Sequence, residues 1–131
     1  MFKKFNENDK AVRSAKYGTS FFGEILQCSK SDLFEMLGEP TIHKDFDALT
    51  RTFNEWVLAS NEEGYIITVY DYWDEENVSY NDYEIIDWHI GARNRHIAEK
   101  GLSMLRQMLN DMYEPLEEIN TRIREAEFEE Y

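Results

Sequence analysis

Basic residues are scarce in this chain, and its middle has none. The 131 residues contain 14 Lys and Arg against 27 Asp and Glu, which gives a formal net charge of −13 at pH 7. No Lys or Arg occurs between Thr52 and Ala92. A surface with this excess of negative charge repels nucleic-acid phosphates and anionic lipids, so we expect neither direct nucleic-acid binding nor membrane binding.

Cysteine and long apolar runs are scarce as well. Cys28 is the only cysteine, so no intrachain disulfide can form and nothing indicates an oxidising compartment. No apolar run reaches the roughly 18 residues of a membrane-spanning helix, and the first residues lack the apolar core of a signal peptide. We therefore expect a soluble, intracellular protein. Its length and its 42% content of hydrophobic residues fit one domain with a substantial core.

The charged residues that are present divide the chain into three parts. Residues 1–16 carry five bases and two acids, and we expect them to form a basic flexible arm. Residues 17–113 are expected to fold as a single α+β domain. Residues 114–131 carry seven acids against two arginines and are expected to form an acidic C-terminal helix.

Hydrophobic periodicity predicts both strands and helices in the central part. We expect an α+β fold in which a small antiparallel sheet of about four strands has its helices packed on one face. Ser29 and Asp32 have the spacing of a helix start, and Gly91 is expected to end the last strand. The predicted strands cover about 21–27, 51–59, 65–72 and 83–90, and the predicted helices cover about 29–37, 94–112 and the segment after residue 115.

Pro115 is expected to end one helix and to begin another, because proline suits the first turn of a helix and disrupts its interior. The second helix needs a partner surface, since a lone helix of about 15 residues is marginal in water. We expect a homodimer, with an antiparallel or self-docked arrangement preferred over a parallel one. The apolar stripe of this helix consists of Leu116, Ile119, Ile123 and Ala126.

The residues that could support catalysis or metal binding do not form a recognisable site. The segment 71–82 has the length of a calcium-binding loop, but Glu76 stands where the sharp turn needs Gly. Cys28 ends an apolar strand, where a buried thiol is the simpler interpretation. His43, His89 and His96 lack the spacing of zinc ligands. We expect no enzymatic activity, no catalytic residue, no metal and no cofactor.

An anion-binding pocket is the alternative that the sequence leaves open. The segment from Trp88 to His96 passes from a strand through Gly91 into a helix start, and helix N-termini bind anions through free N–H groups. Arg93, Arg95 and His96 would add positive charge, and Trp88 could stack on a base. In this alternative the protein sequesters a nucleotide signal of host immunity. In the simpler interpretation, Gly91 only makes a turn and the arginines pair with acids.

Five short motifs occur in a fixed order along the chain. They are Gly-Thr-Ser at 18–20, Leu-Gly-Glu-Pro at 37–40, Glu-Trp-Val-Leu at 55–58, Thr-Val-Tyr-Asp at 68–71 and Trp-His-Ile-Gly at 88–91. This series resembles a group of small phage-encoded accessory proteins of unassigned function, over about residues 17–109. The resemblance implies a viral accessory protein in the cytoplasm of an infected bacterial host, and it carries no catalytic residues across.

The acidic middle of the chain also contains all three tryptophans and five of the eight tyrosines. Carboxylates arranged this densely can take the place of phosphates in a basic groove, and aromatic residues supply interface hot spots. We therefore expect a non-enzymatic inhibitor of a host defence protein, such as a nuclease or a CRISPR-type effector. The other interpretation of these acids is plain solubility. The predicted partner-binding residues are Glu62, Glu63, Tyr70, Asp71, Tyr72, Trp73, Asp74, Glu75, Glu76, Tyr80, Asp82 and Tyr83.

Overall fold

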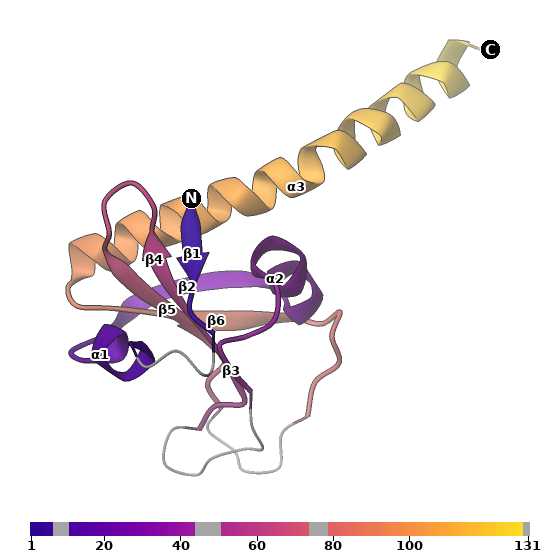
Figure 1. The fold of residues 1–131 in the computed structure, drawn as a ribbon. Coiled ribbons are helices and arrows are strands. Elements are labelled where there is room, and N and C mark those ends of the chain that lie inside the picture. The colour runs from indigo at the N-terminus through magenta and orange to yellow at the C-terminus, as the bar shows by residue number, and fades with distance from the viewer. Residues whose placement is uncertain (7–10, 44–50, 74–78, 130–131) are drawn as a thin grey trace.

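The computed structural model describes residues 1–6, 11–43, 51–73 and 79–129, and for 114–129 it describes the backbone helix alone. The described strands form one sheet in which every neighbouring pair is antiparallel (Figure 1). In chain order the elements are β1 (Phe2–Lys4), α1 (Val12–Lys16), β2 (Ser20–Ser29), α2 (Lys30–Leu37), β3 (Ile42–His43), β4 (Asn54–Ser60), β5 (Ile66–Tyr70), β6 (Ile85–Ala92) and α3 (Arg95–Glu129).

The order of strands across the sheet is β1-β4-β5-β6-β2, and β3 pairs with β4 as well. The predicted α+β class is confirmed, but the sheet has six strands where about four were expected. The additional strands β1 and β3 are only three and two residues long. Such short segments are stabilised by the backbone of β4 beside them, and they leave no hydrophobic period in the sequence.

The core lies between one face of the sheet and helix α3, which packs against β2, β5 and β6. Strand β4 alternates as predicted, with Trp56 and Leu58 fully buried on the core face. The register continues this face into the neighbouring strands, since Leu58 pairs with Ile67 and Trp56 pairs with Val69. The core comprises Leu26, Cys28, Leu33, Trp56, Leu58, Ile67, Val69, Trp88, Ile90, Ala92, Ala98, Leu102 and Leu105.

Helix α3 lies very close to the sheet at Gly101. A Cβ atom at that position would be 2.7 Å from Cγ2 of Ile67, so the helix can take this position only because Gly101 has no side chain. Leu102 and Leu105 are buried on the same side of the helix, as its predicted apolar face requires. Helix α2 begins with the predicted capping box, in which the side chains and backbone N–H groups of Ser29 and Asp32 bond to each other.

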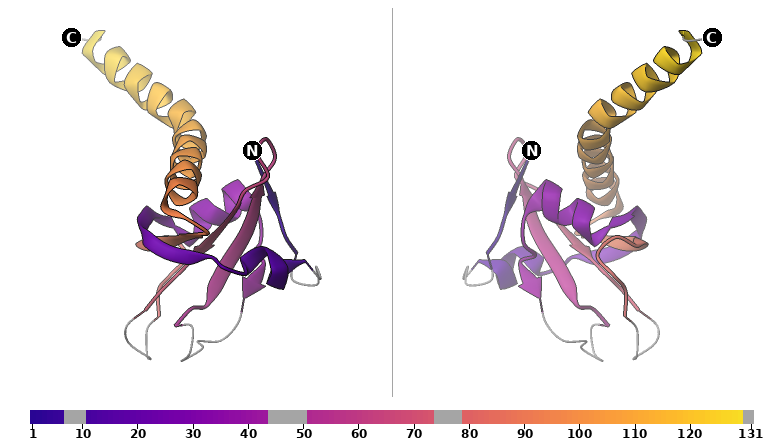
Figure 2. Two further views of the ribbon diagram at one scale, coloured as in Figure 1. Left: turned by 90° about the vertical axis from the view of Figure 1, so that its left-hand side faces the viewer. Right: turned by 90° about the vertical axis from the view of Figure 1, so that its right-hand side faces the viewer.

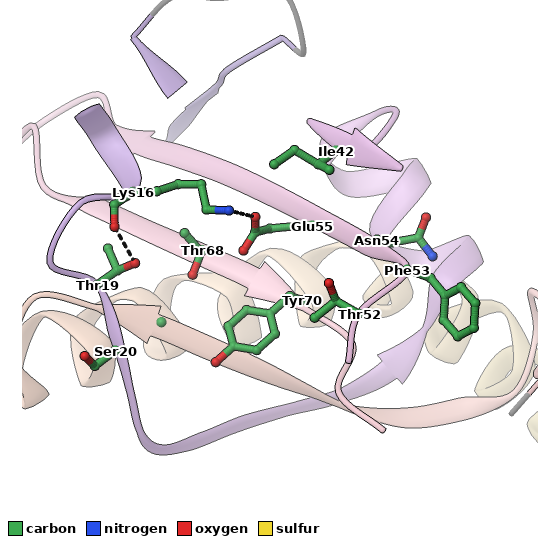
Figure 3. A pocket seen from close by; sticks show the side chains of 11 residues that line it. Lys16, Thr19, Ser20, Ile42, Thr52, Phe53, Asn54, Glu55, Thr68 and Tyr70 are labelled. Carbon is green, nitrogen blue, oxygen red and sulfur yellow. Dashed lines mark hydrogen bonds and ion pairs between the residues drawn. The ribbon is translucent and has the colours of Figure 1, made fainter. Parts of the chain in front are cut away.

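The opposite face of the sheet, called the outer face below, is covered in part by α1. Lys16 of this helix forms an ion pair with Glu55, which points away from the core side of β4. Helices therefore lie on both faces, and the expectation that all of them pack on one face is wrong. The short α1 carries too few apolar residues to be recognised from its pattern. Figure 3 shows the outer face with α1 in front of the sheet and α3 behind it.

The N-terminal segment is not the flexible arm that its charge suggested, over the residues that the structure describes. Strand β1 pairs with β4, with Phe2 opposite Ser60. The Thr41 hydroxyl donates to the Phe5 carbonyl at 2.7 Å and accepts from the Val57 N–H at 2.9 Å. These hydrogen bonds satisfy the edge of β4, which would otherwise present unpaired backbone groups.

Helix α3 continues through Pro115, so the predicted division into two helices is wrong. Proline removes one backbone hydrogen bond and can bend a helix without ending it. Figures 1 and 2 show that the C-terminal part of α3 leads away from the sheet at an angle to its first part. The last described side chain, Tyr113, donates its hydroxyl to Asp32 and connects α3 to α2.

Candidate functional site on the outer face of the sheet

A stack of aromatic rings stands on the outer face, across strands β5, β6 and β2. The His89 ring lies parallel to the Phe21 ring, with 3.9 Å between centroids and an interplanar angle of 11°. On its other side His89 stacks with Tyr72 at 5.2 Å and 14°, and Tyr70 meets it edge-on at 5.5 Å. We call Phe21, His89 and Tyr72 the aromatic stack.

The aromatic stack is accessible to a partner. Phe21 and Tyr72 each keep 40% of their surface exposed, and Ile85, on the same face of β6, is 67% exposed. Asp87 lies between Ile85 and His89 on this face, where it accepts a hydrogen bond from Gln27 at 3.0 Å. Exposed apolar groups gathered beside a carboxylate are typical of a protein-binding surface.

A turn immediately before β6 extends this surface. The side-chain carbonyl of Asn81 accepts hydrogen bonds from the backbone N–H groups of Tyr83 and Glu84 at 2.9 and 3.0 Å. The backbone N–H of Ser31 donates to the Asp82 carbonyl at 2.9 Å and holds the turn against α2. Tyr83 is 80% exposed at this fixed turn. Rigid presentation of an exposed aromatic residue lowers the entropy lost on binding.

Asp71 does not belong to the exposed surface, and its prediction as a partner-binding residue is wrong. It is fully buried, and its Oδ1 accepts from the backbone N–H groups of Phe53 and Asn54 at 2.8 and 3.0 Å. Its Oδ2 accepts from the Tyr80 hydroxyl at 2.7 Å. A buried carboxylate that has these donors fixes the loop entering β4 and is unavailable to a partner.

Tyr80 and Trp73 are also partly buried. The Asn54 amide donates to the Tyr80 hydroxyl at 2.9 Å, and burial raises the pKa of Tyr80 far above its usual range, so its hydroxyl stays protonated. The Trp73 ring lies 5.2 Å from the Tyr80 ring. Both aromatic residues were predicted to contact a partner, but Tyr80 bonds to Asp71 and Trp73 packs against Tyr80. Asp74, Glu75 and Glu76 lie outside the described residues.

The predicted acids do not form one continuous surface. Glu62 and Glu63 lie in the turn that joins β4 to β5, whereas Asp82 lies in the connection from β5 to β6, at the opposite end of β5 (Figure 1). Glu63 forms an ion pair with Lys100 of α3 at 2.5 Å. Of the other predicted residues that stay exposed, Tyr72 lies in the aromatic stack, and Asp82 and Tyr83 lie in the turn before β6.

Phe21 and His89 were missing from the predicted partner-binding residues. The signal that could have identified them is the alternation of β2 and β6, which places every second residue on the outer face. Their direct contact depends on the register of these strands, in which Phe21 pairs with Gly91 and Ile25 pairs with His89. That register is not readable from either segment alone.

The alternative pocket at the junction of β6 and α3 is not formed as predicted. Trp88 is fully buried, donates its indole N–H to the Cys28 carbonyl at 3.0 Å and meets Trp56 edge-on, so it cannot stack on a base. Arg93 donates to the backbone carbonyls of Tyr17 and Ser14. Arg95 and His96 are exposed at the start of α3.

Gly91 and Asn94 also differ from their predicted roles at this junction. Gly91 does not end the strand, because it pairs with Thr68 on one side and with Phe21 on the other inside β6. The Asn94 side chain accepts a hydrogen bond from the Ile97 N–H at 2.9 Å, which satisfies one of the free donors at the helix start. The anion-binding capacity of this helix end is reduced accordingly.

The remaining reactive residues are placed apart from one another. His43 contacts the Asn54 side chain at 2.5 Å, His89 lies in the aromatic stack, and His96 is exposed on α3. Burial raises the pKa of Cys28 to about 12, so its thiol stays protonated at neutral pH. Among the described residues, no group of three or more His, Cys, Asp and Glu side chains is arranged to hold a metal.

No family model, curated protein or solved structure matches the chain significantly. In the part of the chain that the structure covers, no helix has an apolar stretch long enough to cross a membrane. The class that the fold and the site define is an α+β protein with an exposed aromatic stack on the outer face of its sheet.

Proposed function

We propose that the protein is a non-enzymatic phage accessory protein that binds and inhibits a bacterial host defence protein. Its outer face would bind a basic surface on a nuclease or a CRISPR-type effector, where carboxylates take the place of nucleic-acid phosphates. The observation that carries the proposal is the exposed aromatic stack with the Asp87 carboxylate on the same face of β6. The proposed binding surface consists of Phe21, Tyr72, Asp82, Tyr83, Glu84, Ile85, Asp87 and His89.

The chemistry of this surface supports a basic partner. Aromatic side chains contribute strongly to interface energies, and their faces attract the ammonium and guanidinium groups of lysine and arginine. The net charge of −13 steers a basic protein toward the complex and increases the association rate. The only described base within 4 Å of Asp82 is Lys30, at 3.7 Å, which leaves much of its negative charge available.

The phage origin and the host target rest on the resemblance of the five motifs to small phage-encoded accessory proteins. Under this proposal the protein acts in the cytoplasm of the infected bacterium. A negative surface of this kind would compete with the nucleic acid of the target rather than bind nucleic acid itself.

The test is capture from a host lysate, followed by affinity measurement with the purified partner. We expect the captured protein to bind nucleic acid through the same basic surface, and the affinity to fall at least tenfold between about 50 and 300 mM salt. Tyr72→Ala together with Tyr83→Ala should weaken binding by a further tenfold or more. Glu62→Gln with Glu63→Gln, at the other end of β5, is the matched control and should leave affinity within about twofold.

Two outcomes would contradict the proposal. The first is a complex whose affinity is the same at low and high salt. The second is a complex that loses affinity with the Glu62 and Glu63 substitutions and keeps it with those at Tyr72 and Tyr83.

We also propose that the C-terminal part of α3 pairs two copies of the chain in an antiparallel arrangement. The helix leads away from the sheet in Figures 1 and 2, so its own sheet does not cover this part of it. Light scattering is expected to give twice the monomer mass for the full chain and the monomer mass for a chain stopped after Tyr113. A full-length chain that stays monomeric at high concentration would rule out the dimer.

A further inference from the structure

The outer face holds a pocket between α1 and the strands β4, β5 and β6 that the proposed function does not use. Its volume is about 290 Å³, and it lies on the side of β5 away from the core (Figure 3). Pockets for drug-sized ligands begin at roughly 300 Å³, so this one fits a small molecule. The residues that the argument uses are Lys16, Glu55, Thr68, Tyr70 and Gly91, all of which line the pocket.

Gly91 makes the space for the pocket. A Cβ atom at this position would be 2.3 Å from the Thr68 Oγ1 and 3.4 Å from Cε1 of Tyr70. A side chain in this place would therefore displace the Thr68 hydroxyl, whereas its contact with Tyr70 would be an ordinary one. The absence of a side chain at Gly91 leaves room for the Thr68 hydroxyl. Figure 3 shows Thr68 and Tyr70 on the same side of the sheet.

Two hydroxyl groups in the pocket have no hydrogen-bond partner among the residues that the structure describes. Thr68 is only 2% exposed, and its hydroxyl bonds to none of them. The hydroxyl of Tyr70, a half-buried residue, also lacks a partner within the described ranges. Neither hydroxyl is enclosed, because among the described residues Trp73 Nε1 is the only fully buried side-chain N or O atom without a partner. The two hydroxyls are therefore open to a polar ligand or water in the pocket.

The charges of the pocket cancel. Lys16 Nζ lies 2.5 Å from the Glu55 carboxylate, whose side chain is 14% exposed (Figure 3). Burial and the nearby Glu55 raise the pKa of Tyr70 to about 12, so its hydroxyl remains a donor at neutral pH. The pocket thus offers ammonium and hydroxyl donors, carboxylate and hydroxyl acceptors, and the face of one aromatic ring.

We propose that this pocket binds a small neutral polyhydroxylated molecule, either a monosaccharide or the ribose of a nucleoside. Adjacent hydroxyls of such a molecule both donate and accept, which matches the mixed groups around Thr68 and Tyr70. The Tyr70 ring covers the apolar face of a sugar ring. A phosphorylated ligand is disfavoured, because Lys16 is already neutralised by Glu55 and the protein carries a charge of −13.

The experiment is a titration of the isotope-labelled full chain, followed by amide NMR spectra. D-glucose, D-galactose, D-ribose and adenosine are the probes, and ribose 5-phosphate is the charged comparison. We expect saturable shifts of the Thr68, Tyr70 and Gly91 amides with at least one neutral probe. Saturation by a hexose identifies a monosaccharide site, whereas saturation by adenosine and ribose alone identifies a ribose site.

Matched variants test the residues. Tyr70→Phe and Thr68→Val each remove one hydroxyl and keep the shape, and each should weaken binding about tenfold. Tyr83→Phe removes an exposed hydroxyl outside the pocket and should leave binding unchanged. An unchanged amide spectrum away from the substitution shows that each variant is folded.

Three results would overturn the proposal. They are the absence of saturable shifts with every neutral probe up to about 50 mM, tighter binding of ribose 5-phosphate than of ribose, and full affinity in both hydroxyl variants. The titration uses the protein alone, so its failure is distinct from a failure of the proposed partner binding.

Discussion

Replacing Trp88 with Ala is expected to lower the free energy of unfolding by about 3–5 kcal/mol, the usual cost of truncating a large core side chain. Trp88 is fully buried in the hydrophobic core, on β6. Its ring meets Trp56 at 5.5 Å between centroids, and its indole N–H donates to the Cys28 carbonyl. Truncation would leave a cavity between the sheet and α3 and a buried carbonyl without its donor.

Urea denaturation followed by fluorescence or circular dichroism measures this effect. Tyr83→Ala is the control, since Tyr83 is 80% exposed and its loss should change stability by no more than about 0.5 kcal/mol. The two variants separate core packing from partner binding, because Trp88→Ala should lower stability whereas Tyr83→Ala should weaken partner binding. A Trp88→Ala variant with the same free energy of unfolding as the parent would contradict the core position of this ring.

Replacing Asp71 with Ala is expected to cost about 3–4 kcal/mol of stability, although the residue is a single acid in a very acidic protein. The substitution leaves the backbone N–H groups of Phe53 and Asn54 and the Tyr80 hydroxyl without an acceptor. A buried donor left unpaired costs about 1–3 kcal/mol, and hydrogen bonds to a carboxylate are at the strong end of that range.

The comparison that isolates burial from charge is Asp82→Ala, which removes the same net charge from an exposed position. This variant should unfold within about 0.5 kcal/mol of the parent, because the ion pair of Asp82 with Lys30 spans 3.7 Å at the surface. Equal stability of the two variants in urea would show that Asp71 is not the acceptor for this loop. Tyr80→Phe should lie between them, since it removes one of the donors.

The sequence by itself determined those elements whose signals are local. The capping box at Ser29 and Asp32 fixes the start of α2, because both partners lie within one turn. Alternation in β4 places Trp56 and Leu58 on one face and Val57 on the other, since the side-chain period of a strand is two. The helical repeat of apolar residues fixes the buried side of α3 around Leu102 and Leu105.

The short elements and the continuity of α3 could not be predicted in the same way. Strands β1 and β3 and helix α1 are too short to show a period. Strands β1 and β3 form because they pair with the backbone of β4, and α1 is held on the outer face by the ion pair of Lys16 with Glu55. From the sequence, Pro115 predicts the end of a helix. In the structure α3 continues, because the loss of one backbone hydrogen bond bends a long helix without ending it.

Only the tertiary structure decided which acidic and aromatic residues face a partner. Asp71 and Asp82 are the same residue type in the same acidic stretch. Asp71 is buried and accepts a hydrogen bond from the backbone of β4, whereas Asp82 is exposed at a turn. Phe21 and His89 stack although they are far apart in sequence, because the pairing of β2 with β6 sets their register. Composition gives the total charge and aromatic content, whereas strand register and long-range hydrogen bonds determine where these groups lie.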